Sequence, residues 1–204
     1  MSRICFVIMP FSKTATCNGR QWTFIFNQVF KPTIEGSGLD YECRRSVATR
    51  GNIVKQIINE LNDSWVVLAD LTDNNPNVSY ELGVRHSLQQ RTILVAQRRA
   101  QIPFDLRSYA NHVYDWKTAR GRVRFAKQIR ELLVEIDANP ARVDNPVGDY
   151  LNVKPPPTCR FDGLPCWDTT VGAIIPTAPA LAGPAASKLD IRTLVRQLAG
   201  KDRP

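Results

Sequence analysis

The 204-residue sequence lacks any hydrophobic run long enough to cross a membrane. Its longest apolar stretches, at residues 4–9 and 65–69, have the length of strands, whereas a membrane-spanning helix needs about 20 apolar residues. The N-terminus also lacks the order of charged, apolar and small residues that marks a secretory signal. With 43% hydrophobic and 23% charged residues the composition is that of a globular chain, so we expect a cytoplasmic protein that does not bind membranes.

Paired cysteines are also missing. The five cysteines form no C-x-x-C pair, and even Cys159 and Cys166 are separated by six residues. An odd number of cysteines argues against a disulfide framework, and this spacing argues against a zinc site. We therefore expect no metal site and no cofactor.

The formal net charge of +8 lies almost wholly in the first two-thirds of the chain, where residues 1–136 hold 19 Lys and Arg against 12 Asp and Glu. A basic domain can attract phosphates or nucleotides, but a solvated basic face has the same composition, and charge alone leaves both interpretations open. The basic runs at residues 98–99 and 120–124 lack interleaved aromatic residues. A nucleic acid is therefore not the partner that we expect.

Apolar segments of strand length alternate with amphipathic helical segments. Strands are predicted at residues 4–9, 39–44, 65–71, 92–96 and 111–115. Helices are predicted from residue 22 to 30, where Pro32 should kink or end the helix, and at residues 53–61, 75–89 and 125–136. The second helix should bury one stripe: Ile53, Val54, Ile57, Ile58 and Leu61. This alternation predicts an α/β fold with a flavodoxin-like, doubly wound, five-stranded parallel sheet.

The amino-acid composition of the sequence changes beyond residue 137. Ten of the 14 prolines fall between residues 140 and 204, which is the composition of a linker. Residues 187–198 read as a capped amphipathic helix that could pack on its own domain or on a partner. We therefore predict an α/β domain over residues 1–137 and, over residues 138–204, a Pro-rich extension with a terminal helix.

The stretch DLTDNNPNVSYELG, residues 70–83, carries the strongest chemical pattern. It begins with Asp70 at the end of the third predicted strand, and Asn75 and Pro76 are typical of a helix start. Glu81 then falls in the second helical turn, at the edge where open α/β sheets bind ligands. A glutamate near an anomeric carbon can act as a nucleophile or stabilise an oxocarbenium-like centre, with amides and hydroxyls orienting the sugar. Asn77 and Ser79 could supply those groups, together with Asn75.

A simpler interpretation of the same residues stays open at this point. Asp70 could cap a turn, Asn75 could cap the helix, and Glu81 could form an exposed ion pair with Arg85, four residues on.

The segment ADLTDNNPNVSYELG, with VVLAD before it and RTILVA after it, resembles the nucleoside 2-deoxyribosyltransferase-like superfamily. That superfamily includes the deoxynucleoside monophosphate N-glycosidases and shares its fold with TIR domains, and the resemblance covers residues 3–136. It implies that Glu81 is catalytic, with Asp70 beside it. The opening CFVIMPF, residues 5–11, implies that Met9, Pro10 and Phe11 line the base pocket.

The same resemblance guides the expected activity. Asn75 stands where the transferases have an aspartate, and because an amide cannot act as a base, bond cleavage is expected in preference to base exchange. The expected function is cleavage of the N-glycosidic bond of a nucleotide, a nucleoside or NAD, in a homodimer. The alternative is a nucleotide-sensing or TIR-like signalling module without turnover. Arg44 and Arg45, with Arg50, could reach a phosphate, or they could be surface residues.

Overall fold

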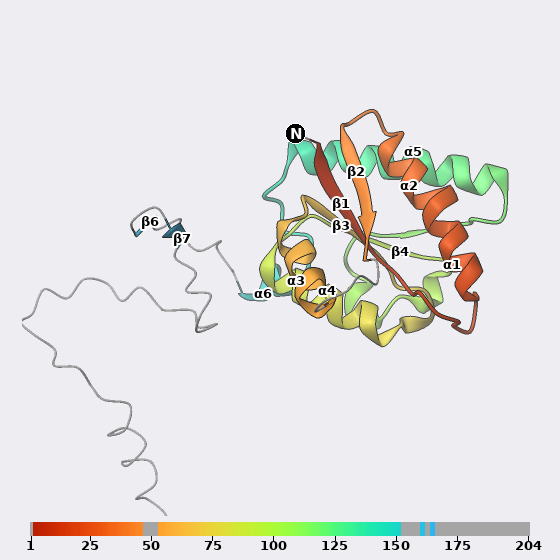
Figure 1. Cartoon of the computed structure of the whole chain (residues 1–204), viewed down its shortest axis with the longest axis horizontal. Coiled ribbons are helices and arrows are strands. Elements are labelled where there is room, and N and C mark those ends of the chain that lie inside the picture. Colours follow the sequence, from red (N-terminus) through yellow and green to blue (C-terminus); the bar gives the residue numbers. More distant parts are fainter. Residues whose placement is uncertain (1, 47–52, 152–159, 162–163, 166–204) are drawn as a thin grey trace, which may run out of the picture. The chain divides into compact units, whose positions relative to one another are not determined.

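The computed structural model describes residues 2–46, 53–151, 160–161 and 164–165. Five parallel strands form one sheet in the order β2-β1-β3-β4-β5 (Figure 1). The strands are β1 (Arg3–Ile8), β2 (Tyr41–Arg45), β3 (Val66–Asp70), β4 (Thr92–Ala96) and β5 (Asn111–Val113). This is the flavodoxin-like strand order, so the predicted fold class is confirmed.

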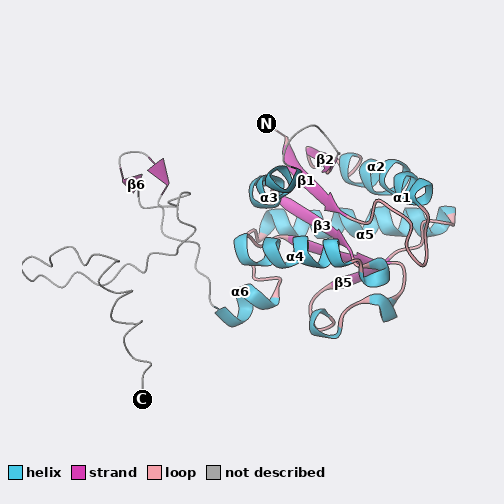
Figure 2. Ribbon diagram, turned by 60° about the horizontal axis from the view of Figure 1, so that its bottom comes forward, coloured by secondary structure: helices cyan, strands magenta, loops and turns pink. Residues whose placement is uncertain are grey.

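Helices cover both faces of the sheet (Figure 2). One face carries α1 (Gly19–Ile25), α2 (Lys31–Glu35) and α5 (Ala119–Ala138), and the other carries α3 (Ile53–Asp63) and α4 (Pro76–Leu88). Successive residues of β1 alternate between the two faces: Cys5 and Val7 belong to the first core, whereas Phe6 and Ile8 belong to the second. A strand buried on both sides explains why the sequence shows continuous apolar runs there instead of alternation.

The helix after β1 continues through Pro32 to Glu35, so it does not end at the proline. A π-helical turn, η1 (Phe26–Phe30), separates α1 from α2, and the Lys31 N–H donates to the carbonyl oxygen of Phe26 five residues earlier. The wider turn places Pro32 in the first turn of α2, where its missing N–H is tolerated.

The predicted buried stripe of α3 is only partly present. Leu61 is fully buried, and Ile57 and Ile58 pack against the core. Ile53 is 38% exposed and Val54 is 55% exposed, so the prediction is wrong for these two residues. The reason is that α3 begins at the carboxyl edge of the sheet, where little of the core lies beneath its first turn.

The first compact unit of the chain ends later than predicted. It spans Met1–Pro155, whereas the sequence pattern placed the boundary at residue 137. The segment beyond that point packs on β4 and α4: Asp144 Oδ2 accepts from the Thr92 N–H at 2.6 Å, and α6 (Pro146–Leu151) contacts α4. These contacts involve few apolar residues, so hydrophobic periodicity did not reveal them.

The described residues of the second unit, Pro156–Pro204, form two strands, β6 (Arg160–Phe161) and β7 (Leu164–Pro165), which pair antiparallel. The helix predicted at residues 187–198, and also Arg50, Cys159 and Cys166, lie outside the described residues. Among the helices of the described part, none is long and apolar enough to cross a membrane. Cys5, Cys17 and Cys43 are buried free thiols, and Cys5 lies opposite Cys43 in the register of β1 and β2.

Candidate functional site

The order in which the strands are added to the sheet reverses between β1 and β3. The connection after β1 covers one face of the sheet, and the connection after β3 covers the other. In open α/β sheets the ligand crevice lies at the carboxyl ends of the strands at such a point. The connections that follow β1 and β3 contain seven of the ten predicted site residues; Asp70 lies at the end of β3, and Arg44 and Arg45 lie in β2. Ile8 pairs with Ala69 in the register, so Met9 and Asp70 follow at neighbouring strand ends.

Helix α4 begins at this edge and presents Glu81 in its second turn. The Asn75 side chain caps the helix, since its Oδ1 accepts from the N–H groups of Asn77 and Val78 at 3.0 and 3.3 Å. The Glu81 side chain flanks the buried stripe that contains Val78 and Leu82 and is itself half-buried. Burial alone raises the pKa of its carboxyl to about 7.

The Glu81 carboxylate has no hydrogen-bond or ion-pair partner among the described residues, and neither a charge nor a hydrogen bond offsets the effect of burial on its pKa. A half-buried carboxylate costs free energy when its charge is not compensated. Such groups cluster at functional sites.

The exposed ion pair between Glu81 and Arg85, which the sequence left open, does not form. Arg85 is fully buried, and its guanidinium donates to four backbone carbonyl oxygens. The Nη1 group lies 2.6 Å from Leu61 O and 3.0 Å from Ser64 O, and Nη2 lies 3.3 Å from Trp65 O and 2.6 Å from Gln90 O. Arg85 therefore joins the end of α3 to the end of α4, and Glu81 is left without it.

Asp70 is buried and fully engaged. Its Oδ1 accepts from the Thr72 N–H at 3.0 Å and from the Thr72 hydroxyl at 2.6 Å, and its Oδ2 accepts from the Tyr114 hydroxyl at 2.6 Å. Burial raises the pKa of Asp70 to about 6, although these hydrogen bonds act in the opposite direction. With 0% exposure and both oxygens hydrogen-bonded, Asp70 caps the turn after β3 in this structure. Its predicted catalytic role stays a prediction.

This geometry predicts a pH-dependent stability. The pKa of Asp70 is higher in the folded chain than in the unfolded chain, so its contribution favours folding at low pH and is lost as pH rises from about 4 through about 6. Asp70→Asn should remove this loss, because Asn can still accept from Thr72 and can donate to Tyr114. Between pH 4 and pH 7.5, urea unfolding should show the variant gaining about 2 kcal/mol relative to the wild type. An equal difference at both pH values would contradict the assignment.

The other predicted residues divide into exposed and buried ones. Met9 is 2% exposed and Pro10 is buried, whereas Phe11 is 47% exposed. That these three residues line a base pocket stays a prediction, and Phe11 is the one of the three that offers an exposed ring. Ser79 precedes Glu81 by two residues and therefore lies on a different side of α4, with its hydroxyl donating to Asn75 O at 3.2 Å. Asn77 precedes Glu81 by four residues, and both side chains lie on the same side of α4.

Sequence patterns missed Asp73, which joins three connections of the sheet. Its carboxylate accepts from the Thr16 N–H at 2.7 Å, from the Thr16 hydroxyl at 2.5 Å and from Gln101 Nε2 at 2.9 Å. Burial acts to raise the pKa of Asp73, but hydrogen bonds to its charged form together outweigh burial and hold the pKa below its usual value. Asp73 and Asn74 both adopt positive φ, at 62° and 49°. The Asp-Asn-Asn run was the available signal, because Asp and Asn tolerate this conformation best among residues with a side chain.

The two predicted phosphate residues differ in their surroundings. Arg44 is exposed and makes two hydrogen bonds to Glu42, with Nε to Oε1 at 2.6 Å and Nη2 to Oε2 at 2.7 Å. Arg45 lies on the other side of β2 and packs over the rings of Phe11 and Phe26.

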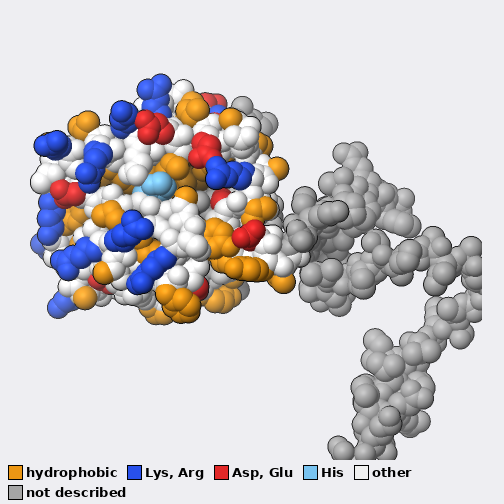
Figure 3. Space-filling model, turned by 180° about the vertical axis from the view of Figure 1, so that it is seen from behind, with side chains coloured by type: hydrophobic (Ala, Val, Ile, Leu, Met, Phe, Trp, Pro, Cys, Tyr) orange, Lys and Arg blue, Asp and Glu red, His pale blue; other side chains and the backbone are white. Residues whose placement is uncertain are grey.

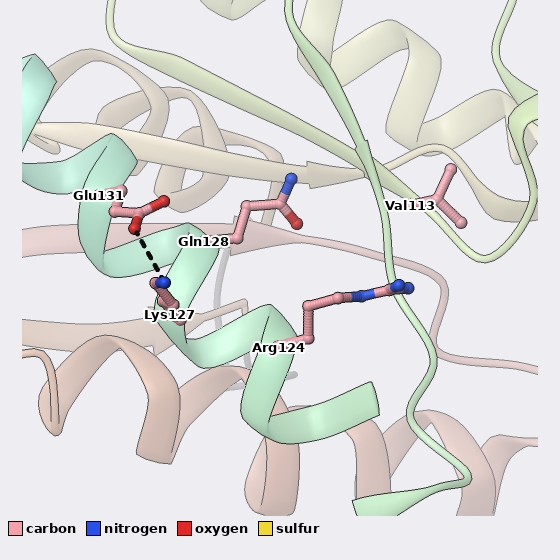
Figure 4. Close-up of a pocket in the computed structure, with 5 residues that line it drawn as sticks. All are labelled: Val113, Arg124, Lys127, Gln128 and Glu131. Carbon is pink, nitrogen blue, oxygen red and sulfur yellow. Dashed lines mark ion pairs between the residues drawn. The ribbon is translucent and has the colours of Figure 1, made fainter. Parts of the chain in front are cut away.

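Other surface features lie away from these residues. A hollow of about 410 Å³ lies between α5 and the edge strand β5, lined by Val113, Arg124, Lys127, Gln128 and Glu131 (Figure 4). It contains none of the predicted site residues, and two of its charges pair with each other, since Lys127 Nζ lies 4.0 Å from Glu131 Oε1. On the face opposite that of Figure 1, Lys and Arg side chains are interspersed with Asp and Glu, as on a solvated surface (Figure 3). We therefore place the candidate site at the carboxyl edge of the sheet.

Neither the family models nor the curated proteins compared with this chain give a significant match. Within the part of the chain that the structure describes, no cluster of three or more His, Cys, Asp or Glu residues could hold a metal ion.

Proposed function

We propose that this chain cleaves the N-glycosidic bond of a nucleotide, a nucleoside or NAD, with Glu81 as its catalytic carboxylate. The observation that carries the proposal is the half-buried Glu81 carboxylate, which has no partner among the described residues. It lies in the second turn of α4, the helix that follows β3, and the strand order reverses between β1 and β3. The resemblance of residues 69–83 to the nucleoside 2-deoxyribosyltransferase-like superfamily supports the same assignment.

The proposed chemistry requires Glu81 in its ionised form. The carbon–nitrogen bond breaks with its electron pair leaving on the base, and the base takes up a proton. The carboxylate either bonds to the anomeric carbon or stabilises its positive charge, and water then supplies the hydroxyl group of the free sugar. Asn77, Ser79 and the ring of Phe11 are predicted residues that are exposed at this edge. Asn77, on the same side of α4 as Glu81, and the Phe11 ring can contact sugar and base.

The test is release of free base. The full chain is incubated with deoxynucleoside monophosphates, nucleosides and NAD, and the products are compared with those of Glu81→Gln by chromatography. We expect base release from at least one class by the wild type alone. Release by both proteins, or by neither across the panel, would remove the proposal, and a ligand-induced shift in melting temperature without release would favour a sensing module.

We also propose a homodimer, because sites in the resembling superfamily are often completed by a neighbouring subunit. Light scattering of the full chain should give a mass near twice 23.0 kDa. A mass near 23.0 kDa would show a monomer.

A further inference from the structure

The net positive charge of the domain is concentrated in one segment, which runs from the end of β4 through β5 into α5. Residues 97–130 hold nine Lys and Arg against two Asp, whereas the rest of residues 1–136 holds ten basic and ten acidic residues. Eight of the nine cations are exposed. Among the described residues, Lys127 is the one of these eight with a carboxylate at ion-pair distance, 4.0 Å from Glu131. We call these eight side chains the basic surface.

Strand β5 is an open edge of the sheet in the described structure. It pairs with β4 on one side, and no described strand pairs with it on the other. The Tyr114 N–H donates to the Ala96 carbonyl oxygen of β4 at 3.0 Å. Because the peptide groups of an extended strand face alternate sides, those of Asn111 and Val113 face away from β4. The outer side of β5 therefore offers backbone donors and acceptors that the sheet does not use.

Cations of α5 lie next to this open edge. Arg124, Lys127 and Gln128 line the hollow between α5 and β5 (Figure 4). Gln128 Nε2 lies 2.8 Å from His112 Nδ1, so the His112 side chain points to the α5 side of the sheet. In a strand added beside β5, every second side chain would point to the same side. Arg124 is the cation that awaits it there, because Lys127 is paired and Arg124 has no partner among the described residues.

The other edge of the sheet, β2, is electrically balanced. Its exposed Arg44 makes both of its contacts with the Glu42 carboxylate of the same strand. At β5 the uncompensated charge determines which chain can pair with the edge. Two copies of this protein would bring two basic surfaces together, and like charges at an edge oppose pairing. An acidic chain has the complementary charge.

We propose that β5 and the basic surface bind an extended acidic segment of a partner protein, which adds to the sheet as a further strand. Main-chain hydrogen bonds to Asn111 and Val113 hold the segment, and a carboxylate at an alternate position pairs with Arg124. The inference goes beyond the proposed function and does not depend on it, because it concerns binding at β5 and none of the residues of the candidate site.

The experiment measures binding of a defined probe to the full chain by fluorescence anisotropy. The probe is a fluorescein-labelled peptide of about seven residues that alternates glutamate and valine, the length and pattern of a strand. One comparison peptide has glutamine in place of glutamate. A second keeps every glutamate but is N-methylated at alternate amides, which removes the donors needed for strand pairing. We expect the acidic peptide to bind at least about tenfold more tightly than either.

Matched variants at the two edges of the sheet locate the binding. Arg124→Gln should weaken binding of the acidic peptide about fivefold, and Arg44→Gln, at the opposite edge, should leave it unchanged. Both residues are exposed, so neither change should impair folding. Amide hydrogen exchange gives a second readout. The peptide should slow exchange at Val113 but not at residues 41–45 of β2.

Four outcomes would overturn the inference. The first is no binding of the acidic peptide at concentrations up to about 1 mM. The second is equal binding of the N-methylated peptide, which would indicate attraction of charge without strand pairing. The third is equal weakening by Arg44→Gln. The fourth is a single-stranded oligonucleotide that binds more tightly than the peptide and displaces it, which would make the basic surface a nucleic-acid surface.

Discussion

Glu81→Gln is expected to reduce base release by at least about 1,000-fold, the scale of losing a carboxylate that acts at the reacting carbon. The amide keeps the size of the side chain but can neither bond to the anomeric carbon nor offset its positive charge. Because burial raises the pKa of Glu81 to about 7, kcat/KM of the wild type should rise with pH, reach half of its maximum near pH 7 and level off above it.

The stability of the folded chain should fall as pH rises, whereas activity should rise. The folded chain holds the Glu81 carboxyl with a raised pKa, so ionisation of this group weakens folding as pH rises from about 4.5 through about 7. Glu81→Gln should therefore melt at a higher temperature than the wild type at pH 8 while it loses activity. Glu131→Gln is the control, because Glu131 is exposed on α5 and pairs with Lys127. Loss of activity in both variants, or a lower melting temperature for Glu81→Gln, would contradict the assignment.

Arg85→Met is expected to destabilise the domain by about 3–5 kcal/mol, a large part of the 5–15 kcal/mol that folded domains possess. The variant keeps the volume of the apolar stem but removes the donors for four backbone carbonyl oxygens, which would then be buried without partners. Burial of the guanidinium lowers its pKa to about 10, so it stays charged at neutral pH. Urea unfolding followed by circular dichroism measures the change.

Arg44→Met is the matched control for this prediction. Arg44 is exposed, and its contacts are with a surface glutamate, so its loss should leave the urea midpoint nearly unchanged. A change of less than about 1 kcal/mol in Arg85→Met would mean that water or a rearranged backbone satisfies the four carbonyls.

Local patterns were sufficient for the sheet and for the position of Glu81. Strands β1, β3 and β4 are short apolar runs between turn residues, whereas β2 (YECRR) and β5 (NHV) are more polar. The Asn75-Pro76 start fixes where α4 begins and hence which residues fall in its second turn. The extent of α3 burial could not be predicted in this way. Periodicity shows which side of a helix is apolar, but not whether the sheet extends beneath its first turn, as Ile53 and Val54 demonstrate.

The contacts that complete the candidate site join residues far apart in the sequence. Asp73 is 57 residues from Thr16, and Tyr114 is 44 residues from Asp70, so no spacing rule connects them. The open alternative of an ion pair between Glu81 and Arg85 fails for a related reason. An acid and a base four residues apart on a helix usually pair at the surface, but here the end of α3 offers unpaired carbonyl groups that bind the guanidinium.

The reaction rates of the buried cysteines with a thiol reagent would measure how often this domain opens. Burial raises the pKa of Cys5 to about 12 and that of Cys43 further still. The nucleophile that attacks a thiol reagent is the thiolate, which forms only when the sulfur is exposed to solvent. With Cys159 and Cys166 changed to serine, the labelling rate of Cys5 and Cys43 would report separation of β1 from β2. Cys17, whose sulfur accepts from Gln97 Nε2 at 3.3 Å, would report loosening of the loop after β1. If a ligand slows the labelling of Cys17 but not that of Cys5 and Cys43, it binds at the carboxyl edge of the sheet. No added probe is needed for this measurement.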